Sequence, residues 1–112
     1  MLARALILGP DRGLEAALAD QGVETARIEG PTTESALEAA GLPDAGLLFV
    51  TDAGEASAIS VAKGLAPDVR IVWYAPASVP GFVTRQLDLG VDPALIEPDS
   101  LVEEQLAAIE AH

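Results

Sequence analysis

The stretch ILGPDRGLEAAL, residues 7–18, decides the fold of this chain. An apolar run ends at Gly9, a charged turn follows, and Leu14, Ala17 and Leu18 then recur at the spacing of one helix face. A buried strand that leads directly into an amphipathic helix is typical of parallel sheets, in which helices connect successive strands. The turn also has the layout of one that holds a phosphate group, although most of the defining glycines are missing.

This order of strand and helix continues along the sequence. Apolar runs predict strands over residues 3–8, 23–28, 45–50, 69–74 and 91–96, with 45–50 at the centre of the sheet. Helical spacing predicts helices over 14–21, from Thr32 or Thr33 to 40, and over 55–65, 80–89 and 98–109. We therefore expect a single α/β domain over residues 1–112, a three-layer Rossmann-like or flavodoxin-like sandwich with five parallel strands and helices on both faces.

The charge balance is strongly acidic. Eighteen Asp and Glu residues face six Lys and Arg residues, giving a net charge of −12, and Lys63 is the only lysine. No basic stripe is present, so we expect no nucleic acid partner. One interpretation is an acidic interaction surface. The spread of acid along the whole chain favours adaptation to a salt-rich cytoplasm, because the Debye length of about 3 Å at ~1 M salt screens self-repulsion.

The composition also disfavours several kinds of site. The chain has no cysteine, which excludes disulfides, thiolate nucleophiles and zinc–thiolate sites. Its one histidine, His112, is the last residue, which disfavours His-based triads and transition-metal sites. The apolar runs are too short to span a bilayer and the N-terminus lacks the pattern of a signal peptide, so we expect a cytoplasmic protein without membrane insertion.

The first predicted turn is a candidate nucleotide site, because ligands of such sheets bind beyond the carboxyl ends of the strands. Gly9 suits a dinucleotide fingerprint, but Asp11 stands where a second glycine would let the backbone approach pyrophosphate. Gly13 gives some room, and Arg12 supplies positive charge. Glu29 lies twenty residues after Gly9, a spacing that suits a ribose diol. The alternative is a purely structural turn in which Asp11 caps the helix.

Small polar residues also follow the central strand. Thr51 and Ser57 offer hydroxyls, and Gly54 lets a ligand approach the backbone. We expect Thr51, Asp52 and Gly54 to face the first turn across the crevice. Alternatively, Asp52 or Glu55 caps the next helix.

The aromatic pair Trp73 and Tyr74 lies in the fourth predicted strand, so the two side chains must face opposite sides of the sheet. Core packing with the tyrosine hydroxyl at the rim is one interpretation. A platform at a subunit interface or beneath an adenine ring is the other.

The predicted topology resembles the receiver domains of two-component signalling. That family needs paired acids after the first strand, a phosphoacceptor Asp after the third, a hydroxyl after the fourth and a lysine after the fifth. Asp11 and Asp52 can imitate the acids and Ser78 the hydroxyl, but residues 91–98 contain no lysine. The resemblance therefore implies a receiver-like fold without phosphorylation chemistry.

Residues 36–75, ALEAAGLPDAGLLFVTDAGEASAISVAKGLAPDVRIVWYA, resemble more closely the second half of the N-terminal RCK domain, also called the TrkA-N domain. The similarity continues through LDLGVDPALIEPDSLVEEQL, residues 87–106. That family has an NAD(P)-binding Rossmann fold and regulates potassium transport by binding NAD(H) or adenine nucleotides. Here one strand and one helix are missing between Ile28 and Thr33, and deleting that edge unit from the order 3-2-1-4-5-6 leaves 2-1-3-4-5. Short stand-alone haloarchaeal proteins look similar, and some carry a CTP synthetase label, which the lack of a thiol for glutamine hydrolysis opposes.

The TrkA-N resemblance implies a non-enzymatic nucleotide-sensing or regulatory module with weak or lost binding of NAD(H) or an adenine nucleotide. The residues that would form its site are Gly9, Asp11, Arg12, Gly13, Glu29, Thr51, Asp52 and Gly54. A transporter or regulatory protein is the implied partner. A homodimer is also expected, because RCK-like domains pair and residues 79–83 place apolar groups on a peripheral helix. The alternatives are a ligand-free protein-interaction domain and a small enzyme that uses Asp11, Asp52 or Glu29 for acid–base chemistry.

Overall fold

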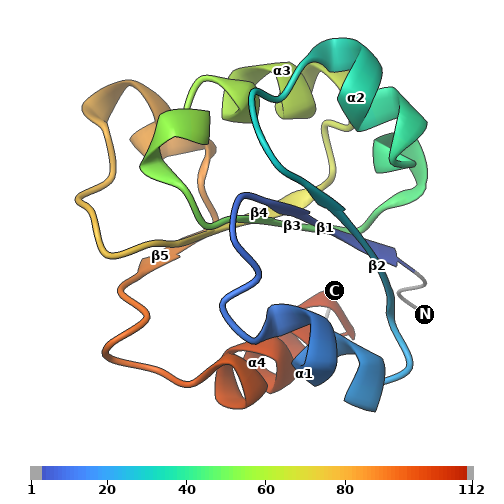
Figure 1. Cartoon of the computed structure of the whole chain (residues 1–112), viewed down its shortest axis with the longest axis vertical. Helices are drawn as coiled ribbons and strands as arrows, with labels where there is room; N and C mark the ends of the chain where they lie inside the picture. Colours follow the sequence, from blue (N-terminus) through green and yellow to red (C-terminus); the bar gives the residue numbers. More distant parts are fainter. Residues whose placement is uncertain (1–3, 111–112) are drawn as a thin grey trace.

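The computed structural model describes residues 4–110. Ala3, the expected start of the first strand, and His112 lie outside the described residues. Five parallel strands form one sheet in the order β2-β1-β3-β4-β5, which confirms the predicted fold class and topology (Figure 1). The strands are β1 (Arg4–Leu8), β2 (Glu24–Ile28), β3 (Leu47–Val50), β4 (Arg70–Tyr74) and β5 (Leu89–Val91).

Helices cover both faces of the sheet (Figure 1). One face carries α1 (Leu14–Asp20) and α4 (Pro98–Glu110). The other carries α2 (Glu34–Ala39), α3 (Ala58–Leu65) and the short 3₁₀ helices η1 (Leu42–Asp44), η2 (Ala53–Glu55) and η3 (Gly81–Gln86). Among the described residues, no helix has the length and apolar character needed to cross a bilayer.

The side chains of β4 show why the core has two halves. Successive side chains of a strand point to opposite faces, so Ile71 and Trp73 pack beneath α3, whereas Val72 and Tyr74 pack against the α1–α4 layer. The Trp73 indole donates to the carbonyl of Ala77 at 3.0 Å. These contacts confirm the prediction that the two aromatic side chains face opposite sides and favour core packing for both.

Tyr74 is anchored at the rim of the α1–α4 half of the core. Its hydroxyl donates to the carbonyl of Ile96 at 2.7 Å. Burial raises the pKa of Tyr74 above its usual value of 10.0, because the phenolate would lose hydration.

The segment between β4 and α4 differs from the sequence prediction. A helix over 80–89 followed by a strand over 91–96 is wrong: η3 ends at Gln86, and Gly90 lies inside β5. The backbone of Asp88 already pairs with Ile71, and its carboxylate accepts from the Ile71 amide at 2.7 Å, which ends the helix before Leu89. The strand stops because Asp92 accepts from the amides of Ala94 and Leu95 in a turn.

Side-chain caps explain where two of the elements on this face begin. The Thr33 hydroxyl accepts from the amide of Ala36 at 3.1 Å and begins α2 as expected. The helix predicted over 55–65 is divided into η2 and α3, because the Asp52 carboxylate accepts from the amide of Gly54 at 2.9 Å and caps a separate 3₁₀ turn.

Candidate functional site

The eight residues predicted to form a site lie at the carboxyl ends of the first three strands. The turn after β1 holds Gly9 to Gly13, and the turn after β3 holds Thr51 to Gly54. Strand order reverses between these two turns, because β2 and β3 lie on opposite sides of β1. The structure thus places the predicted residues of these two turns at the switch point where α/β sheets bind ligands, whereas Glu29 follows the edge strand β2.

Gly9 and Thr51 pack tightly against each other at this switch point, so they leave no space for a ligand between them. Gly9 has a φ of 118°, and a β-carbon there would lie 2.6 Å from the Thr51 hydroxyl oxygen. Thr51 is fully buried, and its hydroxyl lies 2.6 Å from the carbonyl oxygen of Pro10 and 3.1 Å from that of Leu8. The residue expected to face a ligand therefore joins the two turns to each other.

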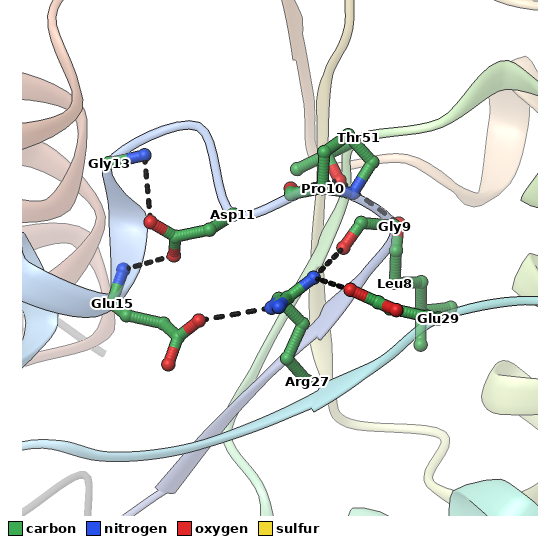
Figure 2. A network of polar contacts seen from close by, with 9 residues as sticks. All are labelled: Leu8, Gly9, Pro10, Asp11, Gly13, Glu15, Arg27, Glu29 and Thr51. Carbon is green, nitrogen blue, oxygen red and sulfur yellow. Dashed lines mark hydrogen bonds and ion pairs between the residues drawn. The ribbon is translucent and has the colours of Figure 1, made fainter.

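Asp11 occupies the anion position of the turn with its own side chain (Figure 2). One carboxylate oxygen accepts from the amide of Gly13 at 3.0 Å, and the other accepts from the amide of Glu15 at 2.7 Å. Amides at a helix start are the groups that bind a phosphate in nucleotide turns. This geometry matches the structural interpretation of Asp11 as a cap, on a helix of only seven residues.

Arg12 and Gly13 are also engaged by the fold. Arg12 has a φ of 51°, and its Nε donates to the carbonyl of Thr51 at 3.0 Å, so it bridges the same two turns. Gly13 has a φ of 83°, and a β-carbon there would lie 2.9 Å from the Pro98 side chain. The start of α1 is therefore packed against the start of α4.

Glu29 is held by Arg27, a residue that the sequence analysis missed. Arg27 contacts Glu29 at 2.6 Å, Glu15 at 3.0 Å and the carbonyl of Gly9 at 3.4 Å (Figure 2). The hydrogen bond to Glu29 is the main cause that raises the pKa of Arg27 above its usual value. Ribose recognition by Glu29 would compete with this ion pair. The available signal was an arginine two positions before Glu29, on the same side of an edge strand.

Glu55 is the second missed residue, since it was considered only as a helix cap. Its side chain accepts from the amide of Thr32 at 3.0 Å, although the residue is only 7% exposed. A β-carbon at Gly30 would collide with the same carboxylate, so the loop after β2 packs tightly on Glu55. Glu55 therefore fastens the β2–α2 loop to η2.

A cavity of about 270 Å³ lies at the same edge of the sheet, beyond β4 and β5. Its walls include Trp73, Pro76, Ser78 and Asp92. Among residues 4–110, no group of three His, Cys, Asp or Glu side chains is arranged to hold a metal ion. The candidate site therefore remains the pair of turns after β1 and β3, in which the polar groups form hydrogen bonds with one another rather than facing an open cavity.

Solved structures of several kinds share this fold, among them response regulators and a TrkA-N domain. An orphan response regulator of H. pylori, HP1043, has 15% identity and a TM-score of 0.70, with 94% of each chain covered. A response regulator of Burkholderia multivorans has 19% identity and a TM-score of 0.65, covering 100% of this chain and 97% of that one. The TrkA-N domain of the Escherichia coli inner membrane protein ybaL has 15% identity and a TM-score of 0.57, covering 96% and 97%. At such identities the likeness is one of fold, and the TrkA-N resemblance is not specific.

The sequence comparisons give a family but no function. No curated protein matches the chain. Residues 5–105 match a family of unknown function, and the chain belongs to this family, DUF7126.

Proposed function

We propose that this chain is a non-enzymatic, cytoplasmic regulatory module whose nucleotide turn binds NAD(H) or an adenine nucleotide only weakly. The observation that carries the proposal is the pair of hydrogen bonds from the Gly13 and Glu15 amides to Asp11. A phosphate would have to displace a carboxylate that is covalently part of the turn. A transporter or another regulatory protein is the proposed partner of such a module.

The charges around the turn support weak binding. Asp11, Glu29 and Asp52 contribute three carboxylates, while Arg12 is bonded to a carbonyl and Arg27 is shared between Glu15 and Glu29. At ~4 Å and an effective dielectric constant of ~20, one contact between like charges costs about 4 kcal/mol, which is nearly a thousandfold in affinity. We therefore expect Asp11 to make the largest single contribution to weak dinucleotide binding.

Enzymatic alternatives find less support in this geometry. Asp11 and Asp52 each accept from backbone amides of their own turns, and Glu29 is paired with Arg27. Receiver-type phosphotransfer would need a lysine near Asp52. Lys63 instead donates to the carbonyl of Val69 at 3.0 Å, immediately before β4 and so at the opposite edge of the sheet.

Calorimetric titration of NAD and ADP in molar potassium chloride tests the proposal. Asp11→Asn removes the charge and keeps one side-chain oxygen that can accept from one of the two amides, which leaves the other amide for a phosphate, so we expect it to bind NAD at least tenfold more tightly than the wild type. Glu29→Ala should weaken any remaining ribose recognition. Asp20→Asn is the matched control, because it removes the same charge at the other end of α1.

Two results would contradict this proposal. The first is low-micromolar binding of NAD by the wild type that Asp11→Asn leaves unchanged. The second is an equal gain in affinity from Asp11→Asn and Asp20→Asn, which would assign the effect to net charge rather than to the turn.

A further inference from the structure

The acidic residues of this chain are unevenly distributed, in contrast to the spread along the whole chain inferred from composition. Of eighteen Asp and Glu residues, only Asp68 lies within residues 56–87. Three of the six Lys and Arg residues, Lys63, Arg70 and Arg85, lie in the same segment. This segment forms α3, β4 and η3, so the exposed surface of α3 and η3 carries almost no acid.

The exposed part of this segment is a defined surface. On α3 the exposed residues recur at the spacing of one helix face, and they are Ser57, Ser60, Val61 and Gly64. On η3, Phe82 and Arg85 are three residues apart, which places them on the same side of a 3₁₀ helix. The Ser60 hydroxyl donates to the Gln86 side chain at 2.8 Å and holds the two elements side by side. We call these six exposed residues the α3–η3 face.

Phe82 is the main apolar group of the α3–η3 face. It is 69% exposed, whereas Val83 is fully buried and Val79 packs against the core. The apolar segment 79–83 expected on a peripheral helix is therefore largely covered, and Phe82 is the part that the core leaves outside. Val61, on the neighbouring helix, is also exposed.

Arg85 is the second distinctive group. Within residues 4–110, the other basic side chains are all bonded inside the fold, namely Arg4, Arg12, Arg27, Lys63 and Arg70. Arg85 is exposed and has no hydrogen bond or ion pair in the described part of the chain. Aromatic residues and arginine are enriched, and acidic residues depleted, where proteins associate.

We propose that the α3–η3 face joins two copies of this chain into a weak homodimer. Two chains that each carry a charge of −12 repel through their acidic surfaces, so they can approach most closely where acid is missing. A twofold axis is the usual symmetry of such a pair. This inference is independent of the nucleotide turn, which lies at the carboxyl edge of the sheet.

The order of elements in this layer makes a twofold contact self-complementary. α3 contacts α2 on one side and η3 on the other. A twofold axis that runs parallel to α3 in the interface places η3 of one copy against α2 of the second copy. Arg85 then meets the helix that carries Glu34 and Glu38, both exposed, and Val61 lies near the axis. Val61 would meet its counterpart at the axis, and Phe82 and Arg85 of each copy would lie against α2 of the other.

The size of the face limits its strength. α3 has eight residues, and α2 and η3 have six each, so we expect the contact to bury less than the roughly 800 Å² per partner of a standard stable interface. We therefore expect exchange between monomer and dimer rather than an obligate dimer.

Sedimentation velocity in molar potassium chloride, over ~10 to ~500 μM so as to bracket a weak interface, tests the proposal. The wild type should show a dimer fraction that rises with concentration. Phe82→Asp should remove it. Leu95→Asp is the matched control, because it also places a charge on an exposed apolar residue, 84% exposed, but in the loop between β5 and α4.

Cross-linking gives an independent readout, since the chain has no cysteine of its own. A disulfide requires Cα atoms about 4.4–6.8 Å apart. Only a cysteine close to the twofold axis can therefore form a disulfide with the same position of the second copy. Under mild oxidation, Val61→Cys should form a linked dimer several times faster than Leu95→Cys. A wild type that stays monomeric at every concentration overturns the proposal, and the α3–η3 face would then be a candidate contact for a different protein. Equal behaviour of the Phe82 and Leu95 variants, or of the two cysteine variants, also overturns it.

Discussion

The carboxylate of Asp11 lies 2.7 Å from the amide nitrogen of Glu15, where α1 begins. The same carboxylate accepts from the amide of Gly13. A charged acceptor at this position both caps the helix and satisfies its positive N-terminal end. In a nucleotide-binding turn the corresponding amides point at a phosphate, whereas here they donate to the Asp11 side chain.

Asp11→Ala should lower the free energy of unfolding by about 1 kcal/mol, because two amides lose their acceptor. Thermal melts followed by circular dichroism in molar potassium chloride would measure the loss. Asp20→Ala removes the same charge from the last residue of α1, where a negative charge is unfavourable, and should leave the midpoint unchanged or raise it. Equal losses in both variants would show that Asp11 does not act as a cap.

Gly9→Ala should destabilise the fold more than Gly22→Ala. Both glycines have positive φ, 118° and 75°, so both variants carry a backbone cost of roughly 1–2 kcal/mol. Only at Gly9 would the new β-carbon collide with Thr51 and Asp52, whereas nothing lies within 4 Å of that position at Gly22. Urea unfolding of the two variants compares them directly, and similar midpoints would mean that the two turns can separate.

Tyr74 should make the fold sensitive to alkaline pH. Its pKa is raised by burial, so the folded state holds the phenolic proton more tightly than the unfolded state does. The stabilisation is therefore complete below the unfolded pKa of about 10 and is lost as pH rises through the higher folded pKa. Unfolding midpoints from pH ~8 to ~11 should fall more steeply for the wild type than for Tyr74→Phe.

The Tyr74→Phe variant has a cost of its own at neutral pH. Loss of the hydrogen bond to the Ile96 carbonyl should reduce stability by about 1 kcal/mol. Parallel pH profiles for the two proteins, offset only by this amount, would contradict a role for Tyr74 in the alkaline transition.

Stability should rise with salt concentration. The net charge of −12 is spread over a small domain, and screening of its repulsion matters against a total stability of ~5–15 kcal/mol. Salt also weakens the Arg27 ion pairs, but these are exposed and few. Melts in potassium chloride from ~0.1 to ~2 M should show a rising midpoint, and a constant midpoint would show that repulsion between acidic side chains does not limit the stability of the fold.

The central strands show how far local pattern reaches. The apolar runs that became β1, β3 and β4 are buried on both faces, and that burial is what removes alternation from their sequences. The switch from these runs to helical spacing was sufficient for the order of elements in most of the chain. The failure between 80 and 96 has a non-local cause, since the Asp88 contacts with Ile71 start β5 and end η3.

For the candidate site, the sequence predicted where the residues lie but not what they do. Its eight residues were located from the strand ends, because parallel strands bring their carboxyl ends to one edge. Their roles could not be read in the same way. Asp11 binds amides two and four residues later and Glu29 pairs with Arg27 two residues earlier, so these contacts are local, yet the sequence pattern fits a ligand role equally well. What the pattern does not show is that Arg27 is held in place by Glu15 and the carbonyl of Gly9, which are 12 and 18 positions away.

By itself, the sequence determined the layers, the class of fold and the position of the first turn, since these follow from hydrophobic period and from the residues that begin and end helices. Only the tertiary structure decided that Thr51 closes the crevice, that Arg27 links α1, β1 and β2, and that Phe82 and Arg85 share an acid-free surface. The physical reason is range: periodicity and capping act within a few residues, whereas Thr51 meets Pro10 across 41 positions and Arg12 meets Thr51 across 39.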